Sequence, residues 1–238
     1  MLHSFQSVDL YDIDWRDAAL NRFWKGLRPK LREAWAKMGE PARLSPSQEA
    51  LTERIRSAFA GLRVGDDTLL YLSAEATDFY YIGDKQLERL CKLEVRDDWQ
   101  QITPDLLAAG NAGFAFMDAE GFRYLLPAFM VNTLLYPQLH LSDESLSFYI
   151  TDEKIAKEKL ALLNDAQRAC VSDFVNEMRL AEMRRDSDLI YWDALLPWEN
   201  DQRVATAPRT YCKSFAEDML LRYCEKHRLS LDLKTPEN

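Results

Sequence analysis

The sequence predicts a mainly α-helical protein that forms a single globular domain. Apolar residues recur at steps of three and four along most of the chain, which is the spacing of one buried helix face. Polar capping residues precede several of these apolar stretches. Only 8 glycines and 9 prolines occur among 238 residues, and 47% of the residues are hydrophobic, so the chain has ample material for a core.

Residues 1–45 are expected to form an N-terminal amphipathic helical extension. An apolar stripe runs from Leu20 to Met38, and most of the basic side chains of this segment lie off the stripe. Pro29 should kink the helix or begin a second one, because it lacks an amide donor. The pattern favours a helix that packs on the core and keeps a solvated basic face. The alternatives are a helix that lies on an anionic membrane or in a partner groove.

Residues 46–180 are expected to form the helical core domain. Ser45 and Pro46 are typical of an N-cap followed by a first helical position. Short helices are predicted for Ser73–Tyr81 and Asp84–Leu93. A further helix should begin after Asp118, whose side chain can accept hydrogen bonds from exposed amides.

Two segments are expected to depart from the pattern of the core helices. The alternation in Leu146–Ile150 predicts a short strand, one half of a β-strand pair. Residues 181–238 are expected to be an aromatic-rich segment and a C-terminal helix that pack on the core. Trp192 and Trp198 could fill gaps on that core or anchor a protein interface, because large aromatic side chains serve both purposes.

Charge restricts the classes of partner. The formal net charge is −9, and residues 51–120 contribute 7 basic and 13 acidic side chains, a net of −6. An acidic field disfavours nucleic acid, whose binding relies on neutralising phosphates with Lys and Arg. It favours a basic protein partner and speeds encounter with it.

Compartment and chemistry can also be addressed from the sequence. The four cysteines are widely spaced and form no Cys-x-x-Cys pair, which is typical of a reducing compartment. No secretory signal is visible, and no apolar run is long enough to span a membrane. A cytoplasmic location is therefore expected. Phosphate-binding glycine loops, His-Glu-x-x-His and Gly-x-Ser-x-Gly are absent. The sequence therefore predicts no cofactor, no metal site and no catalytic residue.

The string Phe116-Met-Asp-Ala-Glu-Gly-Phe-Arg-Tyr-Leu-Leu-Pro-Ala-Phe-Met130 resembles the hallmark of a bacterial family known only as a domain of unknown function. Trp99 and the stretches Ile55–Asp66 and Leu163–Phe174 resemble the flanking parts of that family. The resemblance covers about residues 50–178. It implies a small helical bacterial domain, and it carries over no catalytic residue.

Arg123 is the most distinctive polar residue of this string. Its planar guanidinium could clamp a carboxylate or phosphate of a ligand. It could also form an ion pair with Glu120, three residues earlier, or with one of the many acidic residues upstream. The structural ion pair is the favoured interpretation.

Three classes of function remain open. The first is a non-enzymatic binding protein, most concretely an immunity-type inhibitor that captures a secreted toxin through an acidic surface. The second is an enzyme of unrecognised type with a helical pocket around Arg123, and the third is an adaptor subunit that uses Trp192 and Trp198. The residues expected to contribute to the acidic surface are Asp66, Asp67, Asp97 and Asp98.

Overall fold

The computed structural model describes residues 17–79, 82–141 and 145–184, which all fall within one compact unit. This part of the chain is mainly α, as predicted, and contains no strand. None of its helices is long and apolar enough to cross a membrane. The α-helices are α1 (Ala18–Met38), α2 (Pro46–Ala58), α3 (Tyr71–Phe79), α4 (Asp84–Leu93), α5 (Pro104–Ala109), α6 (Ala119–Leu135), α7 (Ser145–Thr151), α8 (Glu153–Lys159) and α9 (Asp165–Arg184), and the short 3-10 helices are η2 (Trp99–Gln101), η3 (Asn111–Phe116) and η4 (Pro137–Leu139).

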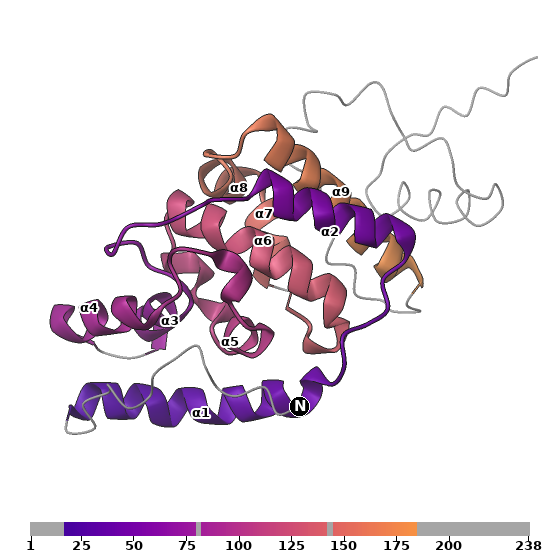
Figure 1. Ribbon diagram of the computed structural model, residues 1–238. Helices are drawn as coiled ribbons and strands as arrows, with labels where there is room; N and C mark the ends of the chain where they lie inside the picture. Colours follow the sequence, from indigo (N-terminus) through magenta and orange to yellow (C-terminus); the bar gives the residue numbers. More distant parts are fainter. Residues whose placement is uncertain (1–16, 80–81, 142–144, 185–238) are drawn as a thin grey trace, which may run out of the picture. The chain divides into compact units, whose positions relative to one another are not determined.

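Helix α6 forms the centre of the core. Figure 1 shows it between α2 and α9 on one side and α5 on the other. Twelve of its residues are buried, because the helix is apolar on nearly every face. Asp118 caps it as predicted and accepts a hydrogen bond from the Gly121 amide at 2.8 Å. The Phe114 ring of η3 packs against Phe129 of α6, with ring centroids 4.7 Å apart.

Local capping explains where two other helices begin. Ser45 and Gln48 form a capping box at the start of α2, with Pro46 in the first turn, which confirms the predicted start. The Asn164 side chain accepts from the Gln167 amide at 2.9 Å, and the Gln167 side chain accepts from the Asn164 amide at 3.2 Å. This reciprocal pair fixes the start of α9.

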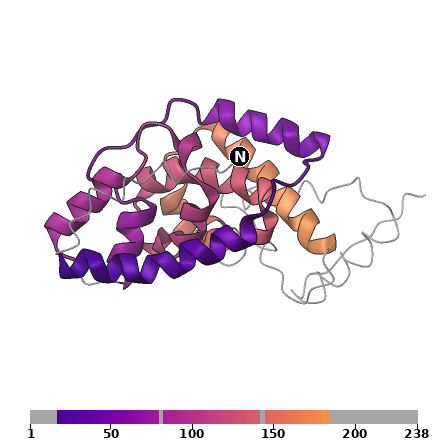
Figure 2. The ribbon, with the colours of Figure 1, turned by 60° about the horizontal axis from the view of Figure 1, so that its bottom comes forward.

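Helix α1 is continuous through Pro29, so the alternative that a second helix begins at this proline is wrong. Pro29 lies on the exposed side, where the carbonyl that loses its helical donor can bond water. The apolar stripe faces inward, and Leu20, Phe23, Trp24 and Leu27 are buried. Figures 1 and 2 show α1 along one edge of the domain, beside α5.

The predicted strand at Leu146–Ile150 is wrong, because these residues lie in helix α7. Leu146 and Ile150 are both buried, as residues four apart on one helix face are. Phe148 would have shared their face in a strand, but the helix turns it outward and leaves it 50% exposed. The Thr151 hydroxyl donates to the Ser147 carbonyl at 2.7 Å. Five alternating residues were too few to distinguish the two periods.

The C-terminal end of α5 packs closely against the start of α3, and glycine permits this approach. A Cβ at Gly110 would lie 2.6 Å from the Tyr71 carbonyl oxygen and 3.1 Å from its carbon. Gly110→Ala should therefore lower the free energy of unfolding by about 1–3 kcal/mol, because backbone atoms would have to move. Urea denaturation measures this, and a variant as stable as the wild type would contradict the packing.

Candidate functional site: an acidic surface built on a buried ion pair

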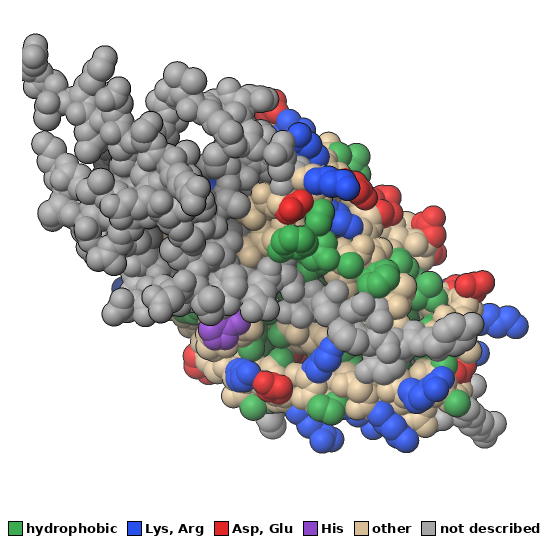
Figure 3. Space-filling model, turned by 180° about the vertical axis from the view of Figure 1, so that it is seen from behind, with side chains coloured by type: hydrophobic (Ala, Val, Ile, Leu, Met, Phe, Trp, Pro, Cys, Tyr) green, Lys and Arg blue, Asp and Glu red, His purple; other side chains and the backbone are tan. Residues whose placement is uncertain are grey.

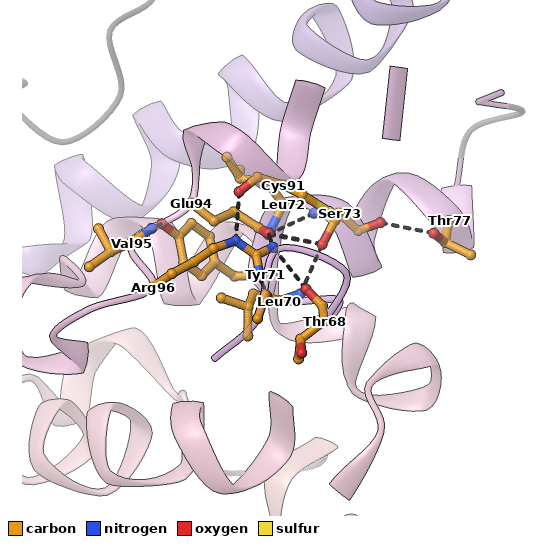
Figure 4. Close-up of polar contacts among 11 residues, drawn as sticks. Thr68, Leu70, Tyr71, Leu72, Ser73, Thr77, Cys91, Glu94, Val95 and Arg96 are labelled. Carbon is orange, nitrogen blue, oxygen red and sulfur yellow. Dashed lines mark hydrogen bonds and ion pairs between the residues drawn. The ribbon is translucent and has the colours of Figure 1, made fainter. Parts of the chain in front are cut away.

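A buried carboxylate caps helix α3 from a distant part of the chain. Glu94, which follows α4, accepts hydrogen bonds from the amides of Leu72 and Ser73 at 2.7 and 2.8 Å. The Ser73 hydroxyl also donates to it, at 3.0 and 3.1 Å to its two oxygens. These amides belong to the first turn of α3, where the helix dipole and unsatisfied donors favour a negative charge. Figure 4 shows the convergence of these groups.

Arg96 completes this centre and joins it to a neighbouring turn. Its Nη2 lies 2.8 Å from Glu94 Oε2, and the side chains of Glu94 and Arg96 are 0% and 9% exposed. Arg96 Nε donates to the Cys91 carbonyl at 2.7 Å, and Nη2 donates to the Thr68 carbonyl at 2.8 Å. Nη1 donates to the carbonyl of Gly65. One guanidinium therefore fastens the end of α4 to the turn at residues 65–68 (Figure 4).

Burial is the main influence on the titration of this centre. It raises the pKa of Glu94 to about 7, while the Ser73 and Leu72 donors and the Arg96 guanidinium act in the opposite direction. Burial also raises the pKa of the Cys91 thiol and that of Tyr71, whose hydroxyl accepts from the Val95 amide at 3.0 Å. The thiol is therefore a poor nucleophile at neutral pH.

The two predicted acidic pairs lie on either side of Arg96. Asp66 and Asp67 occupy the turn whose carbonyls Arg96 binds, and Asp97 and Asp98 follow Arg96 directly. The backbone of Arg96 also accepts from the Val64 amide at 3.2 Å. The backbone on both sides of a gap of about 30 positions, near Asp66 and near Asp97, is therefore held by Arg96.

We call Asp66, Asp67, Asp97 and Asp98 the acidic surface. The first three are exposed, whereas Asp98 is partly buried and caps η2 by accepting from the Gln100 amide at 3.0 Å. Arg63 approaches Asp97 at 3.9 Å, but both side chains are well exposed, so solvent screens the pair strongly. Three carboxylates therefore face solvent on a backbone that Arg96 holds in place.

Arg123 has a different partner from the one expected. Its Nε donates to Gln167 Oε1 at 3.2 Å, and the described part of the chain contains no ion pair between Arg123 and Glu120. Gln167 is buried and donates through Nε2 to the Ala58 carbonyl at 3.0 Å. Arg123 thus joins a polar link between α2, α6 and α9, so the expected ion pair is wrong and a structural hydrogen bond replaces it.

The other residues predicted to belong to a site are the two C-terminal tryptophans. Trp192 and Trp198 lie outside the described residues. The aromatic-rich segment and C-terminal helix predicted for residues 181–238 also lie outside them, except for residues 181–184, which end α9. Trp99 is buried and donates from its indole nitrogen to the Phe59 carbonyl at 2.9 Å. Among the described residues, no three His, Cys, Asp or Glu side chains are grouped so as to hold a metal ion.

Sequence reasoning missed the ionisable residues that lie inside the protein. Glu94 and Arg96 flank a valine just after α4, a pattern that surface residues share, so their burial carries no local signal. Lys159 is also buried; its ammonium donates to the Met117 carbonyl and lies 5.9 Å from the centre of the Tyr149 ring. Burial lowers the pKa of this lysine.

Comparisons with known proteins place the chain in a family without assigning it an activity. No curated protein and no solved structure matches it. Residues 47–202 match a family described as of unknown function, DUF6714. This stretch covers α2 from its second residue onward, the helices from α3 to α9, the acidic surface and the Arg123 link. The chain therefore belongs to the DUF6714 family of unknown function.

Proposed function

We propose that this chain is a non-enzymatic bacterial protein of the cytoplasm that binds a basic protein through its acidic surface, in the manner of an immunity-type inhibitor that captures a secreted toxin. The observation that carries the proposal is the position of Arg96. Its guanidinium holds the turn bearing Asp66 and Asp67, and its own backbone leads into Asp97. The backbone that carries these carboxylates is thereby held in place before any partner arrives.

Preorganisation matters because ordering loops and side chains on binding costs free energy. A turn fixed by hydrogen bonds to a buried guanidinium has already lost much of that freedom. The carboxylates themselves stay in solvent, where their field extends about one Debye length, roughly 8 Å at physiological salt. Such a surface supports fast capture of a partner of opposite charge.

The proposal predicts that charge reversal slows association. The variant Asp66→Lys, Asp67→Lys and Asp97→Lys should bind the basic partner about tenfold more slowly or worse at low salt, because the attractive field becomes repulsive. The difference should shrink as salt rises. Stopped-flow association with the purified partner measures both rates. Asp98 is left unchanged because it caps η2.

A matched control separates local from global charge. Glu53, Glu120 and Glu158 are exposed residues of α2, α6 and α8. Replacing all three with lysine changes the net charge by the same amount but leaves the acidic surface intact. This control should associate much faster than the surface variant. Equal rates for the two variants would show that net charge alone matters and would sink the assignment of the surface.

A second candidate, an adaptor subunit of a larger assembly, is favoured by a different observation. Phe116 at the end of η3 is 39% exposed and Phe148 of α7 is 50% exposed, which is unusual for phenylalanine. In this case Phe148→Ser should leave the fold intact and move the chain from a large complex to a smaller species in size fractionation of native cells. An unchanged distribution would argue against this candidate.

A further inference from the structure

Helix α1 is an addition to the part of the chain that matches the family. The match begins at residue 47, whereas α1 spans Ala18–Met38. The helix is nevertheless firmly docked: its apolar stripe is buried beside α5, and Lys30 forms an ion pair with the buried Glu75 of α3. An appended helix that is held in this way presents its other face at a fixed position.

The outward face of α1 is strongly basic. The helix carries six basic side chains and one acidic side chain, Glu33. Arg22, Lys25 and Arg32 are exposed, and we call them the basic face. They span eleven residues, about 15 Å of helix. Among the described residues, none of these three has a carboxylate within the 4.0 Å that defines an ion pair.

Figure 3 shows blue side chains gathered along the lower edge of the molecule, where α1 runs. The connection between α2 and α3, which bears Asp66 and Asp67, lies away from α1 in both ribbon views (Figures 1 and 2). The segments that carry the basic face and the acidic surface are therefore separated within one copy.

We propose that the basic face of α1 docks on the acidic surface of a second copy of this chain. Both halves of the contact are present in one sequence and have opposite charge. Large polyanions fit the basic face less well, because a chain of net charge −9 is repelled as a whole by nucleic acid or an anionic membrane. A second copy also carries a net charge of −9, but it is compact and presents charges of both signs, so salt screens its distant charges while the facing patches lie within about one Debye length, roughly 8 Å.

The contact joins two different surfaces, so it is heterologous and each copy keeps one free surface of each sign. Assembly continues head to tail unless the ring closes. Self-association would occupy the acidic surface and therefore compete with the external basic partner of the proposed function. It does not depend on the existence of that partner.

Two neutralised variants test the geometry. The first, Arg22→Gln, Lys25→Gln and Arg32→Gln, removes the basic face, and the second, Asp66→Asn, Asp67→Asn and Asp97→Asn, removes the acidic surface. In sedimentation velocity at low salt, the wild type should associate at least about tenfold more tightly than at high salt. Each variant alone should be monomeric.

An equimolar mixture of the two variants is the decisive sample. One retains only the acidic surface and the other only the basic face, so they should form a one-to-one heterodimer that grows no further. The control Glu33→Gln, Lys37→Gln removes an exposed ion pair of α1 without changing net charge, and it should associate as the wild type does. Circular dichroism checks that every variant is folded.

Three results would overturn this proposal: a wild type that is monomeric at low salt, a basic-face variant that associates like the wild type, or a mixture that stays monomeric. None of them bears on the external partner. Conversely, the basic-face variant should bind that partner at least as fast as the wild type does, because its acidic surface is intact. Failure of partner capture and failure of self-association are thus separate outcomes.

Discussion

Replacing Arg96 with methionine should lower the free energy of unfolding by about 3–5 kcal/mol at pH 8. The substitution keeps an unbranched apolar stem but removes a guanidinium that bonds Glu94 and three backbone carbonyls. Glu94 would lose its cation and would either stay charged and unpaired or take up a proton, and the carbonyls of Gly65, Thr68 and Cys91 would lose a donor. The turn that carries Asp66 and Asp67 should loosen as a result.

Urea denaturation of Arg96→Met and of the control Arg63→Met separates the two kinds of ion pair. Arg63 faces Asp97 in solvent, so its replacement should change stability by no more than about 1 kcal/mol. Hydrogen exchange should also show faster exchange at residues 64–68 in Arg96→Met only. If both variants lose the same small amount of stability, the buried pair does not organise this region.

The second large effect is a dependence of stability on pH that comes from Glu94. Burial raises its pKa from the ordinary 4.5 to about 7. The folded state therefore binds the proton more tightly than the unfolded chain does. The stability that this group contributes is fully present below about pH 4.5 and is lost as pH rises through 7. A shift of this size corresponds to a loss of about 3.5 kcal/mol at most, at roughly 1.4 kcal/mol per pKa unit.

The comparison of wild type with Glu94→Gln isolates this contribution, because other titrating groups are common to both proteins. Urea midpoints at several values between pH 4.5 and pH 8 should show wild-type stability falling relative to that of the variant. Stability that instead rises relative to the variant over this range would mean that the Arg96 guanidinium outweighs burial and holds the pKa of Glu94 below 4.5. That outcome would contradict the predicted sign.

The sequence predicted those elements whose signals are local. Ser45 and Asp118 mark helix starts because a capping side chain bonds amides only two or three residues away. The range of α4 was also predicted correctly from its apolar spacing and its boundaries. The short segment at Leu146–Ile150 was not, because tertiary burial of two residues four apart decided its structure.

The candidate site was predicted in part, for the same reason. Charge counting selected Asp66, Asp67, Asp97 and Asp98, and the first three are exposed, as acidic side chains usually are. It could not reveal that Arg96 lies buried between the two pairs and orders them. Glu94 bonds amides more than 20 positions away, and contacts of that kind depend on the tertiary fold. Arg123 illustrates the same limit, because its partner Gln167 lies on another helix.

The buried and the exposed charges of this region have different roles. Glu94 and Arg96 are buried and paired with each other, so they are not available to a partner. Their contribution is to hold the backbone from which three exposed carboxylates project. Loss of Arg96 should therefore reduce partner binding without changing the charge of the acidic surface itself, whereas reversal of the surface charges should leave stability nearly intact.

The central claim, capture of a basic protein by the acidic surface, is tested most directly by affinity capture from native cells with three tagged baits. The baits are the wild type, the Asp66→Lys, Asp67→Lys, Asp97→Lys variant, and the Glu53→Lys, Glu120→Lys, Glu158→Lys control, each at low and high salt, with mass spectrometry of the bound proteins. We predict that the wild type and the control each retain one basic, stoichiometric partner at low salt. High salt should release this partner, and the surface variant should not bind it. Recovery of the same proteins with all three baits, or of no stoichiometric partner with the wild type, would contradict the account.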